Sequence, residues 1–104
     1  MRRNKFGAIP TLIDGIRFDS KGEAKHYADL KYRVMAKEIS DLKLQVRFPL
    51  EVNGKLICTY IADFTYMEDG KFVVSDFKGI RTPVFNIKAK LFEALNGYKI
   101  RISK

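Results

Sequence analysis

Two aspartates and a lysine near the middle of the chain have the types and spacing of a metal-dependent hydrolytic site. Asp63 precedes the turn signal Asp69-Gly70, and Asp76 and Lys78 follow it. A two-residue turn would place Asp63 directly across from Asp76, with Lys78 on the same sheet face as Asp76. Like charges directly opposed destabilise a sheet, whereas a hard divalent cation between them would turn repulsion into binding.

Such a patch predicts metal-assisted phosphodiester hydrolysis. The metal would bind a phosphate oxygen and acidify a bound water, and Lys78 would orient or activate that water or stabilise the transition state. Carboxylate ligands favour Mg²⁺ or Mn²⁺. The prediction depends on the register, because a longer loop would move Asp63 away from Asp76. In the alternative interpretation, Asp63 only ends a strand and Asp76 faces water.

The charge of the chain points to a polyanionic partner. The 104 residues carry a formal net charge of +8, with a sequence pI of about 9.7. Residues 1–25 hold six basic and three acidic residues, and residues 78–104 hold seven and one. The acidic residues therefore gather between two basic ends. This pattern favours nucleic acid as a partner, and less often an anionic membrane.

The composition also excludes several classes of protein. No apolar run approaches the roughly 20 residues of a membrane-spanning helix, and the basic N-terminus lacks the apolar stretch of a secretory signal. One cysteine cannot form an internal disulfide, and one cysteine with one histidine makes a structural zinc site improbable. We expect no membrane association.

The elements that must position this site follow from apolar periodicity and turn signals. They predict one α+β (α/β) domain over residues 1–104, beginning with a small hairpin around Asp14-Gly15. A helix over residues 21–37 follows a Ser20 cap, with Glu23 in the capping-box position. Strands are expected at residues 42–50, 55–66, 71–78 and 98–102, and a second helix at residues 83–95.

Three further expectations concern individual residues. The second helix, which begins after a Thr82 cap, has one apolar face made by Val84, Ile87, Leu91, Ala94 and Leu95. Pro49 favours an edge position for the first long strand or the end of regular pairing. His26 is expected on the surface of the first helix.

The site residues and their flanks resemble a known family. Consecutive blocks across residues 17–95 are similar to phage-encoded proteins of the DUF1064 family, which is placed among the PD-(D/E)XK endonucleases: FDSKGEAKHYADLK, KEISDLKLQVRF, TYIADFTY and VVSDFKGIRTPVFNIKAKLFEAL. The element order is similar to the restriction-endonuclease-like αβββαβ core of that superfamily, a mixed sheet flanked by helices. Ala62 stands where proline gives the motif its first letter.

The resemblance implies roles for individual residues. Lys78 would be the catalytic lysine, and Gln45 an accessory polar residue near the site. The metal ligands would be Asp63, Asp76, the backbone carbonyl of Phe77, and Glu23 as the acidic residue that many members carry on the first helix. Glu23 has an alternative explanation, since its place in a capping box requires no chemistry.

The resemblance also implies DNA as the substrate, and branched DNA such as a Holliday junction for a resolvase-like member. It implies a homodimer, phage DNA recombination or processing, and the cytoplasm of a bacterial host. The basic residues expected to contact phosphates are Arg81, Lys88 and Lys90, together with Arg2, Arg3 and Lys5 in a flexible basic arm over residues 1–10. That arm is equally well explained as a solvated terminus. Two alternatives stay open: a non-catalytic DNA- or RNA-binding module, and a phage assembly or interaction protein.

Overall fold

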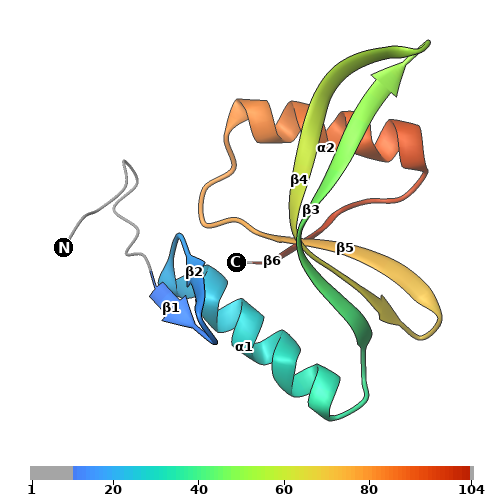
Figure 1. Cartoon of the computed structure of the whole chain (residues 1–104). Coiled ribbons are helices and arrows are strands. Elements are labelled where there is room, and N and C mark those ends of the chain that lie inside the picture. The colour runs from blue at the N-terminus through green and yellow to red at the C-terminus, as the bar shows by residue number, and fades with distance from the viewer. Residues whose placement is uncertain (1–10, 104) are drawn as a thin grey trace.

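The computed structural model describes residues 11–103, so the predicted basic arm lies outside the described residues. In chain order the elements are β1 (Thr11–Ile13), β2 (Ile16–Phe18), α1 (Lys21–Met35), β3 (Ser40–Val52), β4 (Lys55–Glu68), β5 (Lys71–Phe77), α2 (Pro83–Asn96) and β6 (Arg101–Ser103) (Figure 1). Their types and order confirm the predicted elements. Within residues 11–103, no helix is long and apolar enough to cross a membrane.

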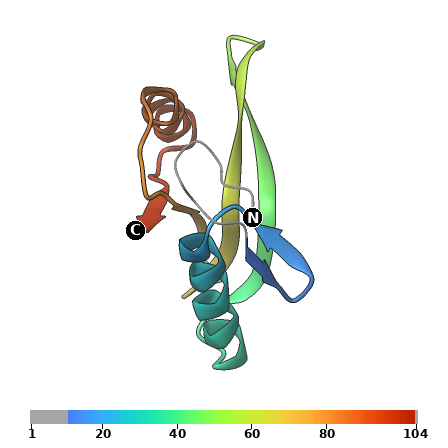
Figure 2. The same ribbon diagram turned by 90° about the vertical axis from the view of Figure 1, so that its left-hand side faces the viewer.

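A mixed sheet forms the centre of the fold. Its strand order is β3-β4-β5-β6, with β6 parallel to β5 and the other neighbours antiparallel. The separate β1–β2 hairpin precedes α1, which confirms the predicted α+β class. Pro49 lies in the edge strand β3, as its missing N–H requires. The β3–β4 hairpin is long, and its turn projects beyond α2 (Figures 1 and 2).

Helix α1 begins where the capping pattern predicts and ends earlier than expected. The Ser20 hydroxyl accepts a hydrogen bond from the Glu23 N–H at 3.1 Å. The helix ends at Met35, because Lys37 takes a left-handed conformation with a φ of 62° and its N–H turns back to the Val34 carbonyl. The predicted end at Lys37 was therefore wrong by two residues.

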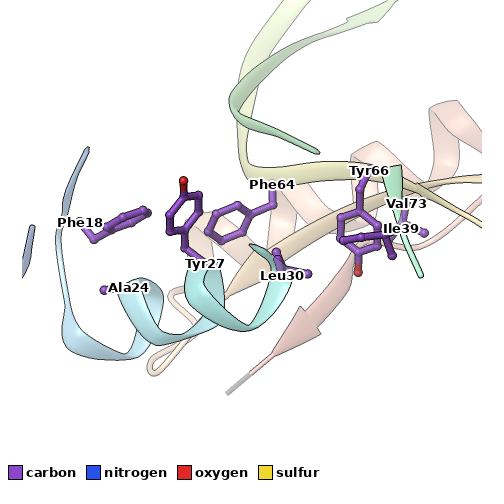
Figure 3. Packing of buried hydrophobic residues seen from close by; sticks show 8 residues of the cluster. All are labelled: Phe18, Ala24, Tyr27, Leu30, Ile39, Phe64, Tyr66 and Val73. Atoms are coloured by element: carbon purple, nitrogen blue, oxygen red, sulfur yellow. The ribbon is translucent and has the colours of Figure 1, made fainter. Parts of the chain in front are cut away.

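An aromatic cluster joins α1 to the sheet. The Tyr27 ring of α1 lies between Phe18 of β2, at a centroid distance of 5.0 Å, and Phe64 of β4, at 6.2 Å (Figure 3). Leu30 and Tyr66 are buried in the same cluster. The burial of several large side chains, each contributing about 1.5–3 kcal/mol, holds the first turn of α1 near β4 and β5.

Helix α2 packs through a different face from the one expected. Thr82 caps its start, accepting from the Phe85 N–H at 3.1 Å, and the left-handed Gly97 ends it. Its buried residues are Phe85 and Phe92, which join a second cluster with Tyr60 and other side chains of the sheet. The predicted apolar face is largely exposed, including Val84, Ile87 and Leu95. Since α2 carries apolar residues on two adjacent faces, packing on the sheet decides which one is buried.

Candidate metal and phosphate site

The β4–β5 register brings Asp63 beside Asp76. The ladder runs from Glu68 opposite Lys71 to Phe64 opposite Ser75, so the next positions along it are Asp63 and Asp76. The Asp63 carboxylate continues the ladder, because its Oδ2 accepts a hydrogen bond from the Phe77 N–H at 2.9 Å. The register predicted from the two-residue turn is confirmed.

Asp76 is completely buried, so the alternative that it faces water is wrong. Its Oδ2 accepts a hydrogen bond from the Tyr60 hydroxyl at 2.5 Å. Its Oδ1 is buried without a hydrogen-bond partner, and the Lys78 Nζ lies 3.5 Å away. Apart from this ion pair with Lys78, the buried oxygen has no hydrogen-bond partner, so it is the atom of the pair best placed to bind a cation.

The Asp63 carboxyl group holds its proton more tightly than a free aspartate does. Burial and the neighbouring Asp76 carboxyl together raise the pKa of Asp63 to about 7, although the Phe77 N–H and Lys78 act to lower it. Near neutral pH Asp63 therefore retains part of its proton, which a divalent cation would displace on binding.

Lys78 is positioned by both its backbone and its side chain. Its N–H donates to the Ser103 carbonyl of β6 at 2.9 Å. Its Nζ lies 4.7 Å from the centre of the Phe85 ring of α2, a cation–π contact, while it also faces Asp76. The ammonium group is thus held at the site by elements on both sides of it.

Glu23 of α1 lies close enough to the site for the charges of Asp63 and Lys78 to affect its pKa. Burial, Asp63 and Asp19 together raise the pKa of Glu23 to about 7, although Lys78 acts to lower it. The helix cap uses the Glu23 N–H, so capping does not require its carboxyl group. The structure therefore brings the predicted acidic residue of the first helix toward the pair.

The close approach of α1 to β5 depends on Gly22. A Cβ placed on Gly22 would lie 2.2 Å from Cζ of Phe77, so any side chain there would displace the Phe77 ring. Phe77 is the residue between Asp76 and Lys78, and its N–H binds Asp63. In the sequence Gly22 only weakens a helix prediction. In the structure it allows α1 to bring Glu23 against the end of β5.

His26 and Ser75 form a contact at the site that sequence reasoning missed. His26 Nε2 lies 3.3 Å from Ser75 Oγ, and Ser75 is buried next to Asp76 in β5. The imidazole packs edge-on against Phe64 at a centroid distance of 5.3 Å. The predicted surface position of His26 was wrong, because its half-buried ring fills the space between α1 and the sheet.

Gln45 lies in β3 on the other side of Asp63. The pairs on either side of it, Leu44 with Phe64 and Val46 with Ala62, place Gln45 opposite Asp63. Its side chain is exposed and its φ of 54° is left-handed, which is uncommon for a residue inside a strand. The local backbone strain thus falls at the point of the edge strand that adjoins the site.

The donor chemistry of the pair suits a hard cation. Carboxylate oxygens and a backbone carbonyl are the ligands that Mg²⁺ and Mn²⁺ take in proteins, and Asp76 Oδ1 has no other hydrogen-bond partner. In the part of the chain that the structure describes, no group of three or more His, Cys, Asp or Glu side chains is arranged to hold a metal ion. The site is therefore a carboxylate pair with Glu23 nearby, rather than a complete ligand shell.

The predicted phosphate-contacting residues occupy different positions. Arg81 Nε donates to Asn86 Oδ1 at 3.0 Å, and Arg81 and Lys90 both line a groove beside α2. Lys88 Nζ instead donates to the Thr59 carbonyl of β4 at 3.2 Å. The remaining predicted contacts lie outside the described residues: Arg2, Arg3 and Lys5.

The comparisons with known proteins bear on the whole chain. No curated protein and no solved structure matches it. The sequence model of one family, described as "Protein of unknown function (DUF1064)", matches residues 3–102, a range that includes both strands of the carboxylate pair, β4 and β5. The chain belongs to the DUF1064 family.

Proposed function

We propose that this protein is a divalent-metal-dependent DNA endonuclease of the PD-(D/E)XK superfamily. The observation that carries the proposal is the buried Asp76, which has one oxygen without a hydrogen-bond partner, Asp63 at its side and the Lys78 ammonium 3.5 Å away. A pair of carboxylates beside a lysine is a poor structural element and a good site for a metal and a phosphate.

The protein's residues would divide the work of phosphodiester hydrolysis. Asp63, Asp76 and the Phe77 carbonyl would hold Mg²⁺ or Mn²⁺, with Glu23 as the additional carboxylate. The metal would supply a Lewis acid for a phosphate oxygen and lower the pKa of a bound water. Lys78 would stabilise negative charge that develops on the phosphate, because its ammonium is already fixed at the site.

The substrate that we propose is branched DNA, as in Holliday-junction resolvases, during phage DNA recombination or processing in the cytoplasm of a bacterial host. Its support is the similarity to the PD-(D/E)XK motif and the basic residues at both ends of the sequence. A four-way junction needs two symmetric cuts, so this substrate implies a homodimer.

A non-catalytic nucleic-acid-binding protein is the second candidate. The observation that favours it is that no three-residue metal cluster is preassembled among residues 11–103, although the chain is strongly basic. In that case the Asp63–Asp76 pair would bind no metal specifically, and DNA would bind equally well with and without Mg²⁺.

A cleavage assay on several DNA structures tests the proposal. The purified protein is incubated with linear duplex, flapped and four-way DNA, in Mg²⁺ and in EDTA. We expect Mg²⁺-dependent cuts, most of them in the four-way substrate. Cutting that persists in EDTA would contradict the proposal, and so would binding of DNA without cutting under every condition, which is the behaviour of the second candidate.

A further inference from the structure

A basic groove lies between α2 and the strand β6. It has a volume of about 540 Å³, and Arg81, Lys90 and Lys99 line it, with Glu93 as the acidic residue and Ile100 and Ile102 as apolar ones. Three cations against one carboxylate give the groove a net positive charge. Grooves of this kind attract phosphate groups, since lysine and arginine are the usual phosphate contacts in proteins that bind nucleic acids.

One cation of the groove is held in a fixed orientation. Arg81 Nε donates to Asn86 Oδ1 at 3.0 Å, and Asn86 also lines the groove. The Arg81 guanidinium carbon lies 5.7 Å from the centre of the Phe85 ring. A guanidinium that is fixed by a hydrogen bond and an aromatic ring loses less side-chain entropy when it binds a phosphate through its remaining donors.

The groove adjoins the carboxylate pair directly. Ile102, which lines it, is the β6 residue paired with Asp76 in the parallel ladder. The Phe85 ring centre lies 4.7 Å from Lys78 Nζ and 5.7 Å from the Arg81 guanidinium carbon, so both cations contact the same aromatic side chain. A strand whose phosphate lies at Asp76 and Lys78 would therefore continue past Arg81 into the groove.

We propose that this groove binds the phosphates of the nucleic-acid strand that flank the one at Asp76. The inference rests on the proposed function for the position of that central phosphate. It assigns Lys99 and Asn86 to the DNA interface alongside Arg81 and Lys90. Lys88 is outside the proposed contact set, because its amino group binds the Thr59 carbonyl.

The salt dependence of DNA binding tests the groove separately from cleavage. Binding of a fluorescein-labelled four-way DNA is measured by anisotropy in EDTA over a series of salt concentrations. The variants are Arg81→Gln, Lys90→Gln and Lys99→Gln. The matched control is Lys43→Gln, which removes the same charge from the exposed face of β3, at the opposite edge of the sheet.

The slope of log K against log salt is negative, and we expect each groove variant to make it less negative by about 0.9, the value for one lost phosphate contact. The control should leave the slope unchanged. If all three variants have the same slope as the parent, the proposal that the groove binds phosphates is overturned, even if the parent cuts DNA. If the variants show reduced salt dependence but the parent never cuts DNA, the result would support phosphate binding in the groove and contradict the proposed nuclease activity. A parent that binds no DNA at low salt would overturn both.

Discussion

The Tyr60 hydroxyl donates a hydrogen bond to Oδ2 of Asp76 at 2.5 Å, and both side chains are buried. This contact fixes the rotation of the carboxyl group, so that its other oxygen is directed to Lys78. Burial and the Asp76 carboxyl raise the pKa of Tyr60, so the phenol stays a proton donor at physiological pH. Tyr60 thus acts on the site through Asp76, as a positioning residue.

Replacing Tyr60 with phenylalanine should weaken metal binding without removing a proposed ligand. Residues that orient metal ligands typically contribute a factor of about 10–100 to affinity, and we expect a loss of that size for Mn²⁺ in Tyr60→Phe, measured by titration calorimetry. Tyr32→Phe is the control, since Tyr32 is 70% exposed. Equal dissociation constants for the parent and Tyr60→Phe would show that the contact is only structural.

The raised pKa of Asp63 makes the metal-free protein less stable as the pH rises. Its pKa of about 7 in the folded state exceeds the value of an unfolded aspartate, so the unfolded state loses its proton first. The contribution of Asp63 is therefore fully present at low pH and is lost between about pH 4 and pH 7. Urea denaturation across this range should give a falling free energy of unfolding in the parent and a flatter profile in Asp63→Asn.

Binding of a divalent metal should restore the stability that the protein loses when Asp63 ionises. A cation that binds only the folded protein stabilises it by about 2.7 kcal/mol at a free concentration of about 100 times Kd. The midpoint of thermal unfolding of the parent at pH 8 should therefore rise with Mn²⁺, while that of Asp63→Asn rises little. An equal rise in both proteins would place metal binding elsewhere.

Gly22→Ala should destabilise the fold, although alanine is the better helix former. The new methyl group would overlap the Phe77 ring, and overpacking of this kind typically costs about 1–3 kcal/mol, which exceeds the helix-propensity gain of up to about 1 kcal/mol. Gly79→Ala is the control, because a Cβ at Gly79 meets nothing within 4 Å. If urea denaturation shows Gly22→Ala to be more stable than the parent, the close approach of Gly22 to the Phe77 ring is refuted.

Glu68 should support the fold at neutral pH and lose this effect in acid. It accepts hydrogen bonds from Arg101 of β6 and from Arg33 of α1, and these contacts lower its pKa. A lowered pKa gives stability that is present above the unfolded pKa and is lost as the pH falls through the folded one. Glu68→Gln should therefore unfold at lower urea concentration at pH 7, with a smaller difference from the parent in acid. Glu51→Gln, at an exposed position of β3, should match the parent at both pH values.

Local patterns predicted the elements and the register of the site. The Asp69-Gly70 turn sets which residues of β4 and β5 oppose each other, and this alone brings Asp63 to Asp76. The Ser20 and Thr82 caps likewise depend on residues three positions away. Contacts within a few residues of one another can be read from a sequence because chain geometry fixes them.

The contacts that sequence reasoning missed join residues far apart in the chain. His26 meets Ser75 only after α1 has packed on the sheet, and Tyr60 meets Asp76 across the neighbouring strands β4 and β5. Helix α2 shows the same limit, since its apolar residues cover two faces and packing chooses the one with Phe85. Tertiary packing decides such cases, and no periodicity within one element contains that information.

The most direct measurement of the proposed mechanism is the rate of cleavage of four-way DNA in Mg²⁺ by the parent, Asp76→Asn and Lys78→Ala, under single-turnover conditions. All three must first unfold cooperatively and be saturated with DNA at the protein concentrations used, as checked by DNA binding in EDTA. We expect no cleavage by Asp76→Asn, and a rate about 10²–10³-fold below the parent for Lys78→Ala, the usual loss when one group that stabilises transition-state charge is removed. Cleavage by Asp76→Asn at the rate of the parent would contradict the proposed site.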